Sequence, residues 1–118
     1  MPRHPHRWPV NSLVAHESAS LAELCRRYGV RRLDLFGSAA AGAFDAARSD
    51  LDFVAEFANP APTVEYADRF LDFAIALEVL LKRRVDVVSA TAIRGSRLAT
   101  AIASTRQVVY AEPHAVAV

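Results

Sequence analysis

The chain has 118 residues, of which 53% are hydrophobic and 23% charged, a balance typical of one globular domain and not of a disordered segment. A formal net charge of +1 gives no argument for direct nucleic-acid binding, and no apolar run approaches the roughly 20 residues that cross a bilayer. Cys25 is the single cysteine, so these residues cannot form a disulfide among themselves. We expect a cytoplasmic protein that does not enter membranes.

The N-terminal part predicts an arm followed by a helix. Residues 1–11 carry three prolines and no hydrophobic periodicity, which indicates a flexible arm and not a secretory signal. A helix is expected from about Ser12 or Ser18 to Tyr28, because Gly29 follows two arginines and so marks a helix end. Cys25 lies on the apolar side of that helix, where a buried and unreactive thiol is expected.

Two strands are predicted on either side of a loop rich in small residues. Residues 30–36 alternate so that Leu33 and Leu35 share one face, and we expect Asp34 to face solvent or to pair with an arginine. Gly37 and Ser38 end this strand. Residues 39–47 predict a short helix or a tight loop, and residues 51–57 predict the second strand.

The second half of the chain predicts two helices and two further strands. Apolar residues recur at helical spacing after Thr63, a plausible N-cap, and this helix is expected to end at the basic residues 82–84. A strand over residues 85–88, a helix over 90–103 and a strand over 107–111 follow. We predict one α/β (α+β) domain over residues 12–112, with a small mixed sheet of about four strands flanked by helices and a tail at 113–118.

Three carboxylates stand in or beside the predicted strands. Asp50 and Asp52 are two residues apart and therefore share one face, while Asp86 is flanked by valines in the third strand. If the second and third strands are neighbours, the three can hold two divalent ions about 4 Å apart, as in nucleotidyl transfer. The alternative is three unrelated aspartates, each satisfied at its own strand end.

A phosphate site is predicted where the first strand ends. Gly37 has no Cβ, so a ligand can approach its backbone closely, and Ser38 adds a hydroxyl and an N–H group. If a short helix begins near residue 39, its free N–H groups form an anion site, and Gly42 keeps the next turn open. Alone this is weak evidence, because Gly-Ser is a common turn.

Together these residues resemble the nucleotidyltransferase superfamily of the DNA polymerase β type. The motif is Gly37-Ser38, eleven spacer residues, Asp50-Leu51-Asp52, and a third acidic residue, Asp86. The short chain resembles the minimal nucleotidyltransferases over about residues 20–111. The resemblance implies two Mg²⁺ ions and ATP as substrate, with catalytic metal ligands at Asp50, Asp52 and Asp86. It also implies nucleotide contacts at Gly37, Ser38, Gly42 and Ser49.

The same resemblance implies a partner protein. Minimal nucleotidyltransferases are often antitoxins whose partners are helical HEPN-type ribonuclease toxins, and some of them silence the toxin by transferring AMP to a tyrosine. A single short domain leaves the acceptor to another chain, so a homo- or hetero-oligomer is expected. The loop departs from the family at Ala41, where an arginine is common, and at Ala43, with Arg48 a candidate replacement cation. The alternative is a weakly active or inactive module that neutralises or assists a helical partner by complex formation.

Overall fold

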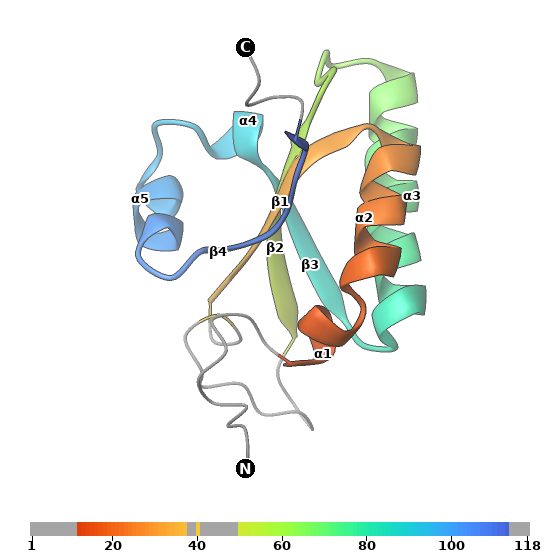
Figure 1. Ribbon diagram of the computed structural model, residues 1–118. Coiled ribbons are helices and arrows are strands. Elements are labelled where there is room, and N and C mark those ends of the chain that lie inside the picture. Colours follow the sequence, from red (N-terminus) through yellow and green to blue (C-terminus); the bar gives the residue numbers. More distant parts are fainter. Residues whose placement is uncertain (1–11, 38–39, 41–49, 114–118) are drawn as a thin grey trace.

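The computed structural model describes residues 12–37, 40 and 50–113. Within these ranges four strands form one mixed sheet in the order β3-β2-β1-β4 (Figure 1). Strand β1 runs antiparallel to both β2 and β4, whereas β2 and β3 are parallel. The predicted fold class is confirmed, with β3 one residue longer than expected. The strands are β1 (Val30–Phe36), β2 (Leu51–Phe57), β3 (Val85–Ser89) and β4 (Gln107–Ala111).

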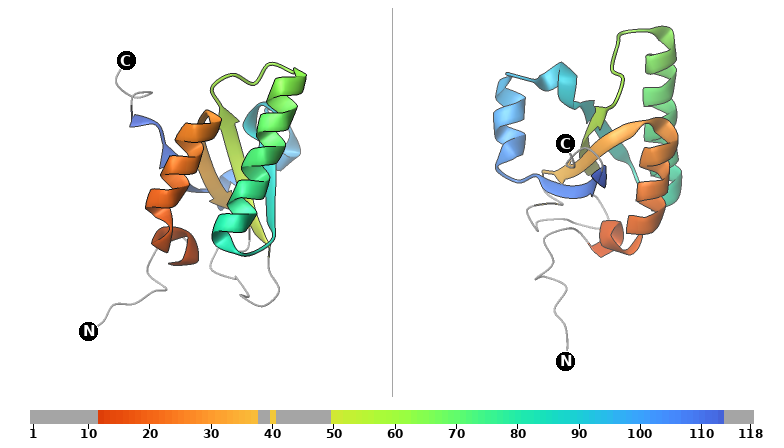
Figure 2. Two further views of the ribbon diagram at one scale, coloured as in Figure 1. Left: turned by 90° about the vertical axis from the view of Figure 1, so that its right-hand side faces the viewer. Right: turned by 45° about the horizontal axis from the view of Figure 1, so that its top comes forward.

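Helices cover the sheet from both sides. The two longest helices, α2 (Ser18–Tyr28) and α3 (Val64–Leu81), pack against one face, and α1 (Ser12–His16) lies at one end of α2 (Figures 1 and 2). The short helices α4 (Ala90–Ile93) and α5 (Arg97–Ala103) lie on the other side of the sheet. The faces therefore differ in how completely helices protect them.

The helix boundaries follow from local capping. Helix α2 ends at Gly29, whose φ of 73° is left-handed and whose N–H donates to the carbonyl of Cys25. The Thr63 hydroxyl accepts the Tyr66 N–H at 3.1 Å and so caps α3. The expected single helix over residues 90–103 is wrong. Gly95 adopts a φ of 79° between α4 and α5, and the Ser96 hydroxyl caps α5 through the Ala99 N–H.

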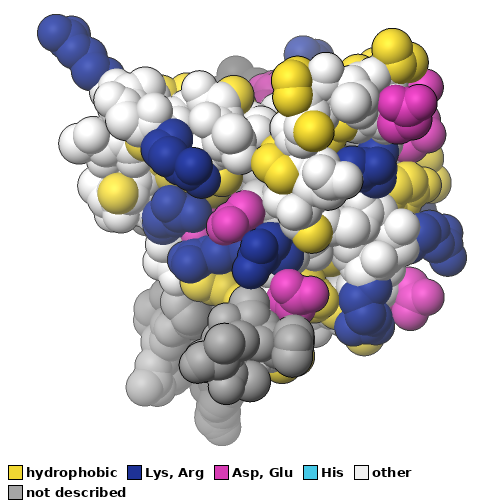
Figure 3. Space-filling model, turned by 90° about the horizontal axis from the view of Figure 1, so that it is seen from above, with side chains coloured by type: hydrophobic (Ala, Val, Ile, Leu, Met, Phe, Trp, Pro, Cys, Tyr) yellow, Lys and Arg dark blue, Asp and Glu magenta, His cyan; other side chains and the backbone are white. Residues whose placement is uncertain are grey.

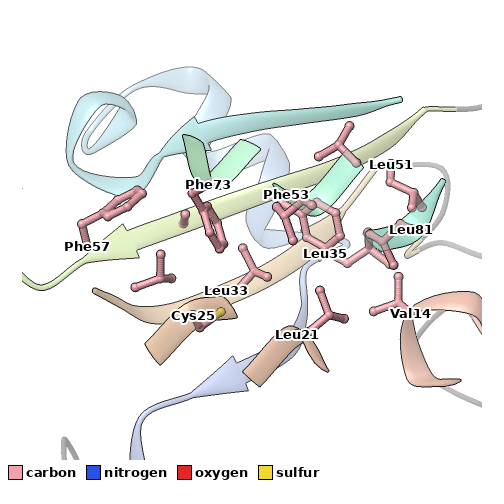
Figure 4. Close-up of a cluster of buried hydrophobic side chains, with 14 residues drawn as sticks. Val14, Leu21, Cys25, Leu33, Leu35, Leu51, Phe53, Phe57, Phe73 and Leu81 are labelled. Carbon is pink, nitrogen blue, oxygen red and sulfur yellow. The ribbon is translucent and has the colours of Figure 1, made fainter. Parts of the chain in front are cut away.

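The hydrophobic core lies between the sheet and helices α2 and α3 (Figure 4). Alternation along β1 and β2 directs Leu33, Leu35 and Phe53 into it, and α3 contributes Phe73. Each such fully buried side chain contributes about 1.5–3 kcal/mol relative to an exposed one. Successive side chains of a strand point to opposite faces of the sheet. The residues that alternate with these core residues along β1 and β2 therefore lie on the face toward α4 and α5.

The surface of the described residues mixes charges of both signs. Seen from above, Lys and Arg side chains lie next to Asp and Glu, with hydrophobic side chains between them (Figure 3). Among the helices that the structure describes, none is both long and apolar enough to cross a membrane. The predicted arm at residues 1–11 and all but the first residue of the predicted tail lie outside the described residues.

Candidate active site

Asp52 and Asp86 lie opposite each other on neighbouring strands. The parallel pairing of β2 with β3 places Asp52 in register with Asp86, which meets the condition that the third strand neighbours the second. Leu51 and Phe53 are buried on the helix-covered side, so Asp52 projects to the other face. Asp52 is half-buried and Asp86 is exposed. A carboxylate pair thus stands on the less protected face of the sheet.

The surroundings of Asp52 disfavour its charged form. Burial raises the pKa of the Asp52 carboxyl above its ordinary value of 3.8, and the nearby charges of Asp86 and Asp50 raise it further. A hydrogen bond with Asp86 acts in the same direction. The pair is therefore a place where negative charge is concentrated and incompletely compensated by the protein.

Asp50 is near this pair but is directed toward an arginine. It precedes β2, and its Oδ1 lies 3.7 Å from Nε of Arg84. In the described part of the chain, no three acidic, histidine or cysteine side chains converge closely enough to hold a metal ion. The Arg84 side chain is 83% exposed, so the ion pair contributes only about 0–1 kcal/mol and Asp50 can turn toward Asp52 at little cost.

Gly37 lies directly against Asp52. Its φ is 77°, and a Cβ built on it would lie 2.9 Å from Oδ2 of Asp52, closer than Cβ atoms normally approach. The Gly37 N–H donates to Oγ1 of Thr105 at 3.1 Å. Only glycine fits both the left-handed backbone and the space beside the carboxylate. The other predicted nucleotide-binding residues, Ser38, Gly42 and Ser49, lie outside the described residues, as do Ala41, Ala43 and Arg48.

Comparison with known proteins decides the family. The sequence profile of the nucleotidyltransferase domain matches residues 18–109. The chain belongs to the nucleotidyltransferase domain family. The predicted resemblance is thereby confirmed, and no sequence among curated proteins matches this nucleotidyltransferase.

Solved structures agree with this assignment. A minimal nucleotidyltransferase is 28% identical, with a TM-score of 0.66 over 83% of this chain and 94% of that chain. A toxin-antitoxin structure with AMP-PNP has a TM-score of 0.60 at 19% identity, covering 83% of this chain and 76% of that one. An AMPylated HEPN toxin of Shewanella oneidensis in complex with MNT antitoxin has a TM-score of 0.52 at 17% identity, covering 86% and 76%. The last two show the shared fold.

Sequence reasoning missed how β4 is attached to β1, the strand that ends directly before Gly37, beside the candidate site. Asp34, in the middle of β1, is fully buried and receives hydrogen bonds from Arg32 and from Arg106, which precedes β4. Pairing with an arginine was one of two expectations for Asp34, and exposure to solvent, the other, is wrong. The signal was a carboxylate inside an apolar strand, which requires a hydrogen-bonding partner when it is buried, but only the fold identifies Arg106 as one of its two partners.

The residues present fit a divalent cation. The candidate donors are carboxylate oxygens, the ligands that hard ions such as Mg²⁺ prefer. Burial, and after it the charges of Asp86 and Asp50, raise the pKa of Asp52, and a cation beside the carboxylates would favour the charged form that these surroundings disfavour. The missing Cβ at Gly37 leaves room beside Oδ2 of Asp52.

Proposed function

We propose that this nucleotidyltransferase transfers AMP from ATP, with Mg²⁺, to a tyrosine hydroxyl of a helical HEPN-type toxin, and so acts as an antitoxin. The observation that carries the proposal is the Asp52–Asp86 pair, aligned across β2 and β3 beside Gly37 in a domain of this family. The choice of ATP and of the partner is supported by fold neighbours, namely a toxin-antitoxin structure with AMP-PNP and an AMPylated HEPN toxin in complex with MNT antitoxin.

The proposed reaction needs carboxylates for two tasks, to accept a proton and to bind Mg²⁺. The acceptor oxygen forms a bond to the α-phosphorus of ATP while the bond from that phosphorus to the bridging oxygen breaks, and pyrophosphate leaves. The proton of the acceptor hydroxyl passes to Asp86, whose exposure makes its carboxylate reachable by a side chain of another protein. Mg²⁺ held by Asp52, Asp86 and Asp50 would neutralise the triphosphate and orient it for in-line attack.

Asp52 and Asp50 differ in how they could bind the metal ion, because they lie at different positions relative to Gly37 and Arg84. Asp52 is fixed by its strand and lies beside Gly37, so its carboxylate would be a ligand of the cation. Asp50 would be a further ligand if its side chain turned away from Arg84. The acceptor comes from the partner chain, which is supported by the fold neighbour in which an AMPylated HEPN toxin is in complex with MNT antitoxin.

A second candidate function is neutralisation by binding alone. An apolar groove of about 700 Å³ lies between α2 and α3, and three apolar side chains of α3 are exposed at a spacing of four residues. These are Leu71, Ile75 and Val79. This surface belongs to the helices on one side of the sheet, whereas Asp52 projects to the other. A partner bound there would be held by a surface separate from the chemistry.

One set of variants separates the two functions. The chain is co-expressed with a candidate HEPN partner, and transfer of labelled AMP and rescue of growth are measured together. Under the proposal, Asp52→Ala and Asp50→Ala abolish labelling and rescue, whereas Asp68→Ala, an exposed carboxylate on α3, changes neither. If Asp52→Ala still rescues growth at normal expression and Ile75→Asp/Val79→Asp does not, binding alone is the function.

A further inference from the structure

The hydroxyl of Thr105 holds the backbone at the point where the chain leaves β1. Thr105 lies between α5 and β4, and its Oγ1 accepts the Gly37 N–H at 3.1 Å across 68 positions of sequence. Gly37 is the residue whose backbone lies against Asp52. A single side-chain contact therefore fixes the turn that borders the carboxylate pair.

Thr105 is itself held from both sides. Its N–H and that of Arg106 both donate to the carbonyl of Ile102, at 3.0 and 2.9 Å, and the Ile102 side chain is buried. On the other side, the Arg106 guanidinium binds the buried carboxylate of Asp34 in β1. The pairing of Leu35 with Gln107 continues the attachment along β4. These contacts hold the backbone of Thr105 in place relative to β1.

The hydrogen bond to Thr105 also limits which other acceptors the Gly37 N–H can bind. While its N–H donates to Thr105, it cannot donate to a phosphate oxygen, because an N–H has one hydrogen. The contribution of Gly37 is then its missing Cβ and its backbone direction. Both depend on the position of the turn relative to Asp52, which the hydroxyl of Thr105 determines.

We propose that Thr105 is a positioning residue of the nucleotide site, in which its hydroxyl fixes the Gly37 turn against Asp52 for binding of Mg²⁺–ATP; the inference rests on the proposed function. Thr105 touches neither substrate nor reacting atoms. It acts through Gly37, and loss of its hydroxyl lets the turn drift from the geometry that the nucleotide requires.

The test uses the full chain and four variants. Thr105→Val removes the hydroxyl at nearly constant volume, Thr105→Ser keeps it, and Thr105→Cys replaces oxygen by the weaker acceptor sulfur. Thr100→Val, an exposed threonine of α5, is the matched control. Binding of Mg²⁺–ATP is measured by calorimetry, exchange of the Gly37 amide by NMR, and KM and kcat by AMP transfer to the partner.

The expected pattern is a binding defect that the conservative variant rescues. Thr105→Val should expose the Gly37 amide to exchange and weaken Mg²⁺–ATP binding about 3- to 10-fold, as loss of one hydrogen bond allows. KM should rise more than kcat falls. Thr105→Ser and Thr100→Val should match the wild type, and Thr105→Cys should be intermediate. Thr105→Cys serves as the decisive variant if Thr105→Val does not fold.

Two results would overturn the inference in distinguishable ways. If the wild type binds Mg²⁺–ATP and the Thr105 variants bind it equally well despite faster Gly37 exchange, Thr105 is only structural and the proposed function stands. If the wild type itself binds no Mg²⁺–ATP, the proposed function fails and the inference fails with it.

Discussion

The guanidinium of Arg106 binds the fully buried carboxylate of Asp34 and thereby joins the start of β4 to the middle of β1. Arg32 binds the same carboxylate from within β1, at 3.0 Å. One buried negative charge is thus shared by two arginines that reach the surface. The ion pair between Arg106 and Asp34 therefore helps to attach β4 to β1, and with it Thr105, which directly precedes Arg106.

Removal of the Arg106 guanidinium should destabilise the fold. Arg106→Ala leaves Asp34 buried with Arg32 as its remaining partner, and we expect a loss of about 1–3 kcal/mol in the free energy of unfolding. Arg26→Ala is the control, because its pair with Glu23 is exposed and should contribute less than about 1 kcal/mol. Urea denaturation measures both. Equal midpoints for the two variants would show that Asp34 does not need Arg106.

Alanine at Gly37 should damage the site more than the same change at Gly95. Both glycines have a left-handed φ, 77° and 79°, so Ala costs each about 1–2 kcal/mol in backbone strain. Only at Gly37 would the new Cβ meet Asp52, whereas at Gly95 nothing lies within 4 Å. Gly37→Ala should weaken Mg²⁺–ATP binding at least about tenfold, and Gly95→Ala should leave it unchanged. Similar affinities for the two variants would contradict the close approach to Asp52.

Asparagine at Asp52 should stabilise the metal-free protein. Burial and the charges of Asp86 and Asp50 raise the pKa of Asp52 in the folded state, so the folded protein disfavours the ionised form. Ionisation therefore costs stability as pH rises from the ordinary value of 3.8 through the folded pKa, and the cost persists above it.

In the presence of a chelator, Asp52→Asn should raise the Tm by a few degrees at neutral pH, with the gain shrinking as the pH is lowered toward the ordinary pKa of aspartate. Added Mg²⁺ should raise the Tm of the wild type and not that of the variant. Thermal unfolding at several pH values measures this, with Asp68→Asn as a control for removal of an exposed charge. A Tm of Asp52→Asn below that of the wild type at neutral pH would show that the carboxylate is stabilised by the protein alone.

Cys25 should be unreactive until the protein unfolds. It is fully buried in α2, and burial raises the pKa of its thiol from 9.0 to about 12. The thiolate fraction at neutral pH is then about a thousandfold lower than for an exposed thiol. Iodoacetamide should label native protein negligibly and urea-unfolded protein completely, as mass spectrometry will show. Rapid labelling of the native chain would mean that α2 opens readily.

The strands could be predicted from the sequence because the hydrophobic pattern of each one lies within its own residues. The alternation around Leu33 and Leu35, and the apolar run that begins at Leu51, define β1 and β2 without reference to the rest of the chain. The predicted continuous helix over residues 90–103 is wrong because Gly95 interrupts it. Its left-handed backbone and the cap at Ser96 make it a boundary.

The candidate site was predictable only in part, because its geometry depends on strand order. The types and spacing of Asp50, Asp52 and Asp86 indicated metal chemistry, but the register that aligns Asp52 with Asp86 arises from the parallel pairing of β2 with β3. No local pattern identifies Thr105 as the partner of Gly37, since 68 positions separate them. Contacts of this kind appear only when the whole sheet is assembled.

The strand order has a consequence for synthesis of the chain. Strand β1 lies between β2 and β4, so its second neighbour leaves the ribosome only after β2, α3 and β3 have been synthesised. Until then Asp34 has no Arg106 and the Gly37 amide has no Thr105. Such distant pairing raises contact order and delays folding of the sheet. A nascent chain stalled before Thr105 can carry all three aspartates and still lack the contact that holds Gly37, which forms only after Thr105 has been synthesised.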